Sequence, residues 1–316
     1  MSGKKYLIGI IYKLLDVLIS YIHHKITTGV CVSSRHLVGK VVLVTGGTSG
    51  IGYETAADLA ERGARVLIAS NERHGDSVRD TIVARSGNTD VHFIYLDLAS
   101  LDSVRSVAEK ILSTEKRLDV LINNAGVLFT PNMKSDDGIS LGMQINYFGP
   151  FLLTNLLLPL ITQSSPSRII NVSSTAYKYG LVDLDNLIEP RTGCFPSFYL
   201  YCDSKLCVAL MTVELARRLQ GTGVTANFLH PGCSRSNIVN HVPITLISVL
   251  VFIFGKFVKT PCEAAQTSIY LAVSPDVQNV SGCYFEECRV KEINKKASNK
   301  DLATNLWCMS EKVVGI

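Results

Sequence analysis

A tyrosine and a lysine stand four residues apart in the stretch Tyr201-Cys-Asp-Ser-Lys205. On a helix, residues at that spacing share one face, so the phenol and the ammonium are expected to lie side by side. A free phenol has a pKa of about 10 and is a poor proton shuttle at neutral pH. A neighbouring positive charge favours the phenolate and lowers that pKa. Tyr201 could therefore give a proton to a carbonyl oxygen during reduction, or take one from an alcohol during oxidation.

A glycine-rich turn, TGGTSGIG, runs from Thr45 to Gly52. It follows an apolar run that predicts a strand and opens a pattern that predicts a helix. Glycines permit the positive φ of a tight turn and let the backbone approach a pyrophosphate, which the N–H groups of a helix N-terminus attract. Three residues separate Gly46 from Gly50, so the spacing differs from the G-x-G-x-x-G pattern. The turn predicts a nucleotide site between strand and helix.

These residues must be positioned by the elements around them. From residue 40 to about 285, short runs rich in Val, Ile and Leu alternate with helical patterns. Such alternation predicts a parallel sheet with both faces covered, a Rossmann-type doubly wound α/β fold. No repeat or linker divides the region, so one domain is expected over 40–290, followed by a C-terminal extension over 291–316. Strands are predicted at 41–45, 65–70, 91–97, 119–124, 168–174 and 224–230, and helices at 50–62, up to about 85, at 101–115, up to 160, and at 199–219.

The turn and the motifs after it resemble those of the short-chain dehydrogenase/reductase family, over roughly residues 40–290. Each motif ends a predicted strand or lies in the helix that follows, where an open α/β sheet presents its ligand-binding loops. Their order along the chain also matches the family. The motifs are the turn at 45–52, Asp97-Leu98, Asn123-Asn124-Ala125-Gly126, Asn146, Ser174, the YxxxK pair at 201 and 205, and His230-Pro231-Gly232.

This resemblance implies a nicotinamide cofactor and a role for each motif. Tyr201 is implied to transfer the proton, while Lys205 lowers its pKa and hydrogen-bonds the nicotinamide ribose. Ser174 is implied to hold the substrate oxygen, and Asn146 to organise a water that links the proton path to solvent. The implied cofactor-binding residues are Gly46, Thr48, Ser49, Gly50, Ile51, Gly52, Arg73, Asp97, Leu98, Asn123, Asn124, Ala125, Gly126, Tyr201, Lys205 and Pro231.

Neighbouring residues offer alternatives for some of these roles. Ser173 competes with Ser174, and the family pattern assigns the role to the second serine. The segment 175–198 is long for the family's smaller members and is expected to form a substrate-side loop. Cys202 and His230 are expected to pack rather than to react.

The choice between NAD and NADP depends on the residues after the second predicted strand. An acid there binds the NAD ribose, and an arginine accommodates the NADP phosphate. The chain carries no acid at Ser70 or Asn71, and Arg73 is close enough to receive a 2′-phosphate. The other interpretation of Arg73 is a solvated charge at a helix start. We expect NADP(H) rather than NAD(H).

Composition excludes several classes of protein. Hydrophobic residues make up 47% and charged residues 18%, which suits a large core and excludes disorder. The net charge is +4 without a Lys/Arg run, so nucleic acid is not an expected partner. The nine cysteines form no CxxC pair, which predicts reduced thiols in a reducing compartment rather than a disulfide framework.

An apolar segment, Tyr6–Ile22, precedes the domain and is interrupted by Lys13 and Asp16. It falls short of the roughly 20 apolar residues of a spanning helix, so an anchor, a cleaved signal peptide and an amphipathic core helix compete. The anchor is favoured because a secreted product would lack cellular nucleotide and expose its cysteines to oxidation. Basic residues after the segment predict that the following domain lies on the cytosolic side, with 1–39 as anchor and connector. The membrane is expected to be that of the endoplasmic reticulum, with another intracellular membrane as the alternative.

A second apolar segment, Ile244–Phe254, is too short to span a bilayer. It predicts a buried core helix, or else a surface element that covers an apolar substrate or inserts partly into a membrane. Residues 244–258 are accordingly assigned to the substrate side.

The C-terminal half resembles the retinol dehydrogenase 11-to-14 group of the family. This resemblance implies an anchored, mostly NADP(H)-preferring enzyme that interconverts retinol and retinal, with membrane lipid and a lipophilic substrate as partners and a homodimer as a possible assembly. Steroids, farnesal and lipid aldehydes are alternative substrates. A catalytically silent cofactor-binding adaptor is disfavoured because the serine, tyrosine and lysine are intact. The similar stretches are 150–160, 201–219, 230–238, 257–273, 281–289 and 305–311.

Overall fold

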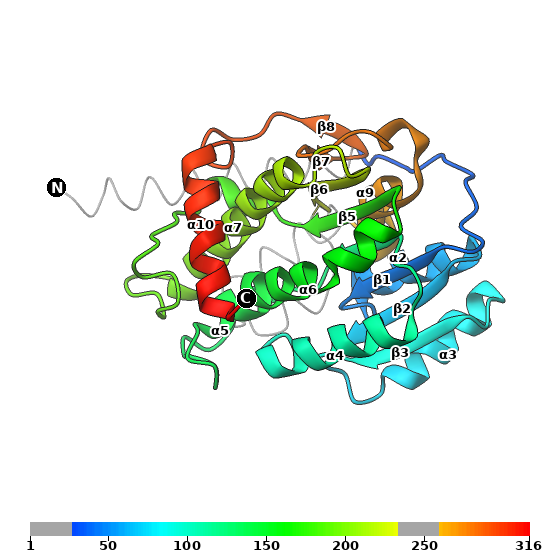
Figure 1. The fold of residues 1–316 in the computed structure, drawn as a ribbon, viewed down its shortest axis with the longest axis horizontal. Coiled ribbons are helices and arrows are strands. Elements are labelled where there is room, and N and C mark those ends of the chain that lie inside the picture. The colour runs from blue at the N-terminus through cyan, green and yellow to red at the C-terminus, as the bar shows by residue number, and fades with distance from the viewer. Residues whose placement is uncertain (1–26, 233–258) are drawn as a thin grey trace.

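The computed structural model describes residues 27–232 and 259–316, and an eight-stranded sheet forms its centre (Figure 1). The strand order is β3-β2-β1-β4-β5-β6-β7-β8, in which only β8 runs antiparallel to its neighbour. This confirms the predicted doubly wound fold. The strands are β1 (Val41–Thr45), β2 (Arg65–Ser70), β3 (Val91–Tyr95), β4 (Val120–Asn123), β5 (Ser167–Val172), β6 (Val224–His230), β7 (Tyr284–Glu286) and β8 (Arg289–Lys291).

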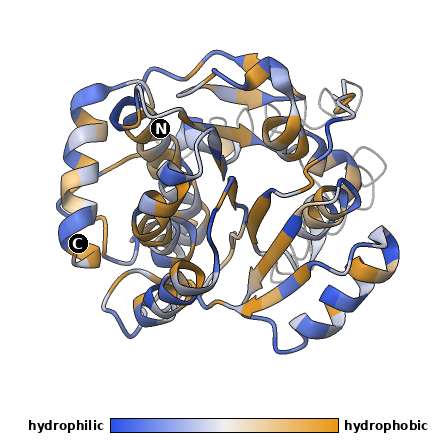
Figure 2. Ribbon diagram, turned by 45° about the vertical axis from the view of Figure 1, so that its right-hand side comes forward, coloured by the Kyte–Doolittle hydropathy of each residue, from blue (hydrophilic) through white to orange (hydrophobic). Residues whose placement is uncertain are grey.

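The inner strands are buried along their whole length. Every residue of β1, β4, β5 and β6 is buried, whereas the edge strand β3 has exposed positions. Strands covered on both faces are therefore continuous apolar runs, and Figure 2 shows them as the hydrophobic centre of the molecule.

Helices form a layer on each face of the sheet. On one face, α2 (Gly50–Glu61), α3 (Gly75–Ser86) and α9 (Pro261–Val273) cover an apolar cluster that includes Val42 and Ile68. On the other, α4 (Leu101–Thr114), α6 (Gly149–Gln163), α7 (Pro196–Arg218) and α10 (Lys300–Val314) share a second cluster around Leu43 and Leu121. The sheet thus lies between two helical layers, and its carboxyl edge stays open for a ligand.

One predicted helix is interrupted. The stretch through residue 160 was expected to be a single helix, but α5 (Leu141–Met143) passes into a π-helical turn, η1 (Gln144–Phe148), before α6 begins. A π turn holds one more residue than an α turn, and such turns are frequent at functional sites. Asn146 lies inside this turn.

The C-terminal extension belongs to the same core as the sheet. The predicted boundary at 290 falls within β8, and α10 packs against α7 (Figure 1). Trp307 is buried and meets Phe151 edge-on, with ring centroids 4.9 Å apart. The Ser310 hydroxyl lies 2.7 Å from the buried Tyr147 hydroxyl. Residues 300–314 therefore complete the helical layer over the sheet.

The two apolar segments Tyr6–Ile22 and Ile244–Phe254 lie outside the described residues. Within the described ranges, one helical stretch, Leu141–Gln163, is long and apolar enough to cross a membrane. However, 67% of its most apolar window is buried in the protein, as in the core helix of a globular domain. Membrane attachment therefore stays a prediction.

Candidate active site

A cavity of about 430 Å³ opens at the carboxyl edge of the sheet, where β1, β2, β3 and β4 end. All eight residues of the predicted turn except Gly47 line it, together with the first residues of the β4 loop. Further lining residues are Ala69, Ser70, Asn71, Glu72, Leu96, Asp97, Leu98, Asn124, Ala125, Gly126, Val127, Leu128, Phe129 and Ile145.

The glycine turn is closed so tightly that two of its glycines are required. Gly46 has a φ of +64°, which favours glycine, and a Cβ on Gly52 would lie 2.1 Å from the Gly46 carbonyl oxygen. The turn leads into the N-terminus of α2, whose first turn carries no acidic residue. Unpaired N–H groups and the helix dipole therefore favour an anion at this end of the cavity.

The β4 loop is tied to the end of β1 through Thr45. The Thr45 hydroxyl accepts hydrogen bonds from the backbone N–H groups of Asn124 and Ala125, at 3.0 and 3.1 Å. The Asn124 side-chain amide donates to the Thr45 carbonyl at 2.9 Å. Asn124, Ala125 and Gly126 are thereby held against the turn as cavity lining.

Asn123 has a different position from the rest of its motif. It is buried, and its side-chain amide donates to Thr154 on α6 and to Asn171 on β5, at 2.9 and 2.8 Å. It does not contribute to the cavity lining. Its side chain joins strands to helix, so Asn123 has structural contacts at the position where the resemblance implied contact with a cofactor.

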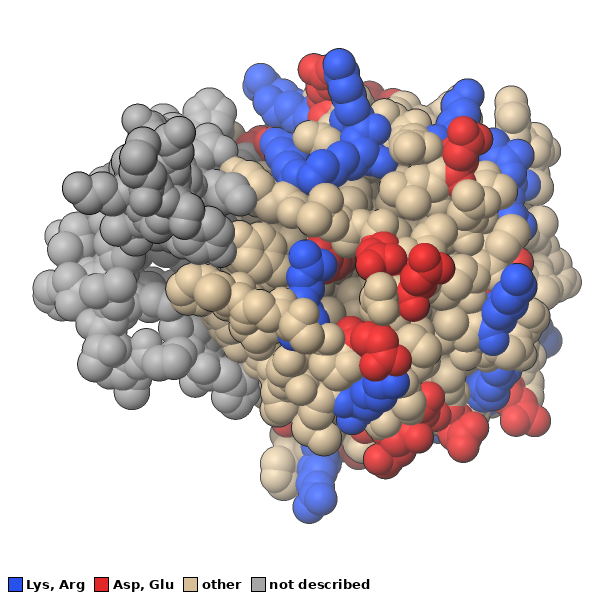
Figure 3. Space-filling model, turned by 90° about the vertical axis from the view of Figure 1, so that its left-hand side faces the viewer, with Lys and Arg blue, Asp and Glu red and all other residues tan. Residues whose placement is uncertain are grey.

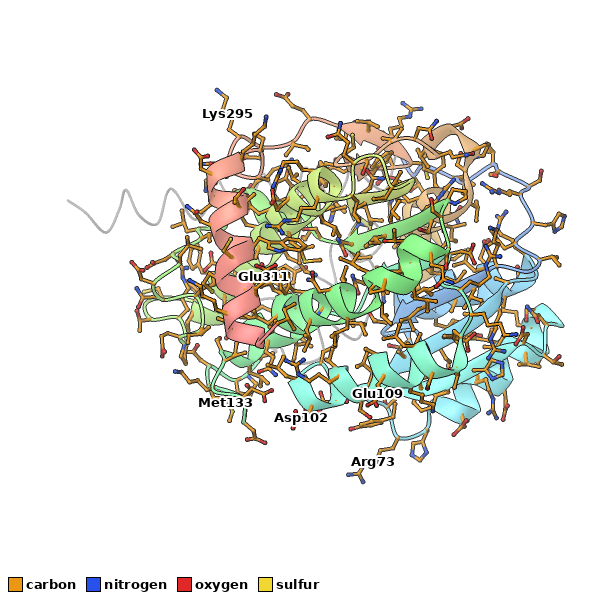
Figure 4. The ribbon with its side chains drawn as sticks, in the orientation of Figure 1. Arg73, Asp102, Glu109, Met133, Lys295 and Glu311 are labelled. Atoms are coloured by element: carbon orange, nitrogen blue, oxygen red, sulfur yellow. The ribbon has the colours of Figure 1, made fainter. Side chains whose placement is uncertain are left out.

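At the end of β2, the structure places Glu72 rather than Arg73 in the cavity lining. The Ser70 hydroxyl bonds the Thr48 hydroxyl at 2.9 Å, which joins the end of β2 to the glycine turn. Arg73 is exposed and extends away from the ribbon into solvent (Figure 4). Contact between Arg73 and a 2′-phosphate stays a prediction.

Lys205 is buried on α7 directly beside Tyr201. Only 3% of Lys205 is exposed, and its ammonium donates to the Val172 carbonyl at 2.9 Å. The same nitrogen lies 5.6 Å from the centroid of the Tyr201 ring. Burial lowers the pKa of Lys205 to about 8. Tyr201 is half-buried, so its phenol combines access from the surface with a nearby cation.

Asn146 holds the β4 loop close to Lys205. Its side-chain amide exchanges two hydrogen bonds with the backbone of Val127, both at 2.8 Å, and donates to the Ser204 hydroxyl at 3.1 Å. A Cβ on Gly126 would lie 3.2 Å from the Lys205 nitrogen and 3.4 Å from the Asn146 oxygen. The absence of a side chain on Gly126 lets these two groups converge.

The two neighbouring serines have different environments. The Ser173 hydroxyl is buried and donates to the main-chain carbonyl of Lys205 at 3.0 Å. Ser174 is half-buried at the N-terminus of η2 (Thr175–Tyr179), where its hydroxyl accepts a weak bond of 3.2 Å from the N–H of Ala176. The Ser174 hydroxyl keeps its own proton to donate to a ligand oxygen.

Three residues that the sequence singled out lie outside the cavity lining. His230 and Pro231 are buried at the end of β6, and Cys202 is buried on α7.

Other features of the site were not predicted from the sequence. Val127, Leu128 and Phe129 extend the lining beyond the predicted motif. Asp203, between the tyrosine and the lysine, is buried against the long segment that precedes α7. An acidic residue on the buried face of a helix is a signal in the sequence. The partners of Asp203 could not be predicted, because they lie in a different segment of the chain.

Comparison with known proteins agrees with this geometry. The short chain dehydrogenase family model matches residues 40–187. The chain is 46% identical to mouse retinol dehydrogenase 14, over 88% of this chain and 86% of that protein, and 42% identical to human retinol dehydrogenase 13, over 92% and 89%. The chain belongs to the short-chain dehydrogenase/reductase family and is an oxidoreductase. Within the family it falls in the group of retinol dehydrogenases 11 to 14.

Solved structures support the same assignment. An uncharacterized protein from Mycobacterium paratuberculosis superposes with a TM-score of 0.73 at 29% identity, over 91% of this chain and 98% of that chain. The NADP complex of Pseudomonas aeruginosa RhlG superposes with a TM-score of 0.63 at 28% identity, over 79% and 95%. The family fold implies a nicotinamide cofactor, and the glycine cradle, the acid-free helix N-terminus and the elongated lining fit one.

Proposed function

We propose that the chain is an NADP(H)-dependent enzyme that interconverts a lipophilic alcohol and its aldehyde or ketone, with retinol and retinal as the substrate pair. The observation that carries this proposal is the buried Lys205 ammonium beside the Tyr201 ring, next to Gly126, which lines the cavity of about 430 Å³. The retinoid pair is supported by the relatives, which are named retinol dehydrogenases.

The proposed reaction assigns one task to each group around the carbonyl. The reduced nicotinamide, when bound, supplies the hydride for the carbonyl carbon. Ser174 donates a hydrogen bond to the substrate oxygen and stabilises the negative charge that develops there. Tyr201 gives its hydroxyl proton to that oxygen, and in alcohol oxidation it takes the proton back.

Lys205 and Asn146 support the proton transfer. A protonated Lys205 beside the ring stabilises the phenolate and lowers the pKa of Tyr201. Its hydrogen bond to the Val172 carbonyl uses one of the three ammonium protons, which leaves two for the ribose and for a water. Asn146 fixes the loop on which such a water would rest, because it holds both backbone groups of Val127.

The preference for NADP(H) is part of the proposal. The end of β2 has Ser70 and Asn71 where an acid would repel a 2′-phosphate, and Arg73 follows two residues later on a flexible side chain. Glu72 lines the same region and is the group that would oppose the phosphate. The balance between Glu72 and Arg73 therefore decides the cofactor, and both residues can be changed.

We also propose that the protein is attached to the endoplasmic reticulum membrane with its catalytic domain in the cytosol. The segment Tyr6–Ile22, the basic residues after it and a site that needs cytosolic nucleotide support this orientation. Basic and acidic side chains are interspersed on the face in Figure 3, with uncharged residues between them. That face therefore gives no reason to expect a long-range electrostatic partner, and the apolar segment remains the means of attachment.

The experiment that tests the function uses the full chain in microsomes. All-trans-retinal, a steroid ketone and farnesal are each offered with NADPH and with NADH, and alcohol formation is measured. Microsomes that carry Tyr201→Phe are the matched control, because that variant keeps the ring and loses the proton. Highest kcat/KM for retinal with NADPH supports the proposal. Preference for another carbonyl reassigns the substrate, and activity equal to the control with every carbonyl overturns the function.

A further inference from the structure

The carboxylate of Asp203 faces the segment that precedes α7. Asp203 is only 4% exposed, although it lies midway between Tyr201 and Lys205. One carboxylate oxygen accepts the backbone N–H of Leu181 at 2.7 Å. The other accepts a hydrogen bond from the guanidinium of Arg191, with which it forms an ion pair. A single buried charge on α7 thus holds the segment at two points.

The first of these points, Leu181, follows Ser174 by seven residues in the chain. Gly180 packs so tightly on α7 that a Cβ there would lie 2.4 Å from the Cys202 carbonyl oxygen. On the other side, the Lys296 ammonium donates to the Gly180 carbonyl at 2.9 Å. The chain from Ser174 to Leu181 is therefore fixed between α7 and residues that lead into α10.

Tyr177 fastens the middle of this short stretch. Its ring is fully buried and meets the rings of Tyr284 and Phe228 edge-on, with centroids 5.1 and 5.7 Å away. Its hydroxyl accepts the backbone N–H of Asn294 at 3.1 Å. These contacts hold the stretch in the core. The remainder is held by the 2.7 Å bond from the Ser140 N–H to the Ile188 carbonyl and by the buried Leu187, and Asp203 adds its two bonds at the ends.

The second point, Arg191, also reaches the loop after β4. Its backbone carbonyl accepts a hydrogen bond of 2.8 Å from the Asn132 side-chain amide. Its guanidinium lies 5.7 Å from the centroid of the Tyr199 ring, two residues before Tyr201. Arg191 therefore joins three elements: the segment before α7, α7 itself and the loop whose start lines the cavity.

We propose that Asp203 and Arg191 are positioning residues that hold the substrate-side segment 175–195 against α7, so that Ser174 and Tyr201 act on the same carbonyl oxygen. The expected loss of activity rests on the proposed function, whereas the expected loosening of the segment does not. Neither side chain is assigned a contact with substrate or cofactor. Loss of the pair shifts the segment, and a displacement of about 1 Å at a reacting centre costs on the order of 10²-fold in rate.

The test compares four variants of the full-length enzyme. Arg191→Gln and Asp203→Asn each remove the ion pair, and Arg191→Lys keeps the positive charge. Glu189→Gln is the matched control, since it breaks the Lys134–Glu189 ion pair of 2.6 Å on the same segment, where both side chains are largely exposed. The first two variants should lower kcat/KM for the carbonyl substrate by about tenfold to 10²-fold. The KM for NADPH should not change, because the cavity lining excludes both residues.

A double variant and a rescue separate positioning from general damage. If the two residues act as a pair, Arg191→Gln combined with Asp203→Asn costs no more than the worse single variant. Arg191→Lys should recover most of the lost kcat/KM. Independent, additive losses, or a loss equal to that of Glu189→Gln, would overturn the pairing.

Hydrogen–deuterium exchange tests the structural part without any turnover. The peptide that contains Leu181 and Arg191 should exchange faster in Arg191→Gln and in Asp203→Asn, and at the wild-type rate in Glu189→Gln. Unchanged exchange in all three would overturn the inference even if the enzyme reduces retinal. If the two variants exchange faster but the wild-type enzyme reduces no carbonyl, the role of the Asp203–Arg191 pair is supported and the proposed function is wrong.

Discussion

The hydroxyl of Ser173 donates a hydrogen bond of 3.0 Å to the main-chain carbonyl of Lys205. This bond joins the end of β5 to the helix that carries the reaction centre. Successive side chains of an extended chain point to opposite sides, and Ser174 has extended backbone angles. When Ser173 turns into the core, Ser174 therefore points to the other side, where it is half-buried.

This difference predicts opposite phenotypes for the two serines. Ser174→Ala should lower kcat by about 10²–10³-fold with little effect on thermal stability, because it removes one donor to the developing oxyanion. Ser173→Ala should lower stability by roughly 1 kcal/mol, the typical value of one buried hydrogen bond, and should leave kcat nearly intact. Steady-state kinetics and melting curves check both, and the reverse ranking would transfer the serine role to Ser173.

Replacement of Tyr201 by Phe removes the transferable proton and keeps the ring. We expect turnover to disappear while the KM for cofactor, or its Kd from nucleotide fluorescence, stays close to the wild-type value. Lys205 would still be held by the Val172 carbonyl in this variant. A variant that kept most of its kcat would show that another group transfers the proton.

Burial of the Lys205 ammonium has a consequence for stability as well as for rate. Its folded-state pKa of about 8 lies below the value of 10.5 for free lysine. Between these two values the unfolded chain binds more protons than the folded one, so stability in the absence of cofactor should rise with pH over that range. Below pH 8 the cost of burying the charge is present in full, roughly 3 kcal/mol.

Lys205→Met removes this cost and provides the test. At pH 7 the variant should resist urea at least as well as the wild-type enzyme, despite losing activity and cofactor affinity. The advantage should shrink as the pH rises towards 10.5 and vanish well above it, where the wild-type amine is neutral in both states. A variant that is less stable than wild type at pH 7 would contradict the assigned cost of burial.

Local pattern was sufficient for the first six strands and for the glycine turn, because buried parallel strands and a strand–turn–helix junction are short-range features. The three-residue strands β7 and β8 were not predicted. The order of the motifs also placed Asn124, Gly126, Asn146 and Lys205 together. Other details depend on contacts between distant segments. The π turn at Asn146, the inward side chain of Asn123 and the Asp203–Arg191 pair arise only when helices pack on the finished sheet.

The ends of the predicted strands show the same limit. Residues 91–97 and 168–174 were expected to be strands throughout, but β3 ends at Tyr95 and β5 at Val172. Asp97, just beyond β3, lines the cavity, and Ser174, just beyond β5, is the predicted substrate contact. Their side chains bond nearby backbone N–H groups of Ala99 and Ala176, which ends the strand where the ligand loops begin.

Cofactor preference should respond to Arg73 and Glu72 in opposite directions. Arg73→Ala should raise the KM for NADPH several-fold and leave that for NADH nearly unchanged, since a charge-assisted bond to the 2′-phosphate is lost. Glu72→Gln should lower the KM for NADPH, because an acid in the cavity lining is removed. Equal effects of Arg73→Ala on both cofactors would show that Arg73 is only a solvated charge.

Deletion of residues 1–25 should release the protein from microsomes. The deletion leaves intact a contact of the remaining chain with the domain, the 2.7 Å hydrogen bond from the Gly29 N–H to the Glu287 carboxylate. The fold should therefore survive, which melting curves check. Full-length protein should stay in the pellet after a carbonate wash, and protease added outside sealed microsomes should digest the domain. A domain that is protected from protease would overturn the cytosolic orientation.

The burial of Trp307 and of its neighbours on α10 predicts the fate of a chain that is truncated before this helix. A chain that stops before Lys300 would still contain the glycine cradle, the serine, the tyrosine and the lysine. Its sequence motifs alone would therefore suggest an active enzyme. That chain would lack the helix that covers α7 and would expose Phe151 and the ring of Tyr147 to solvent. Such a truncated chain should be degraded rather than accumulate, because the helix that carries the tyrosine and the lysine needs α10 to cover it.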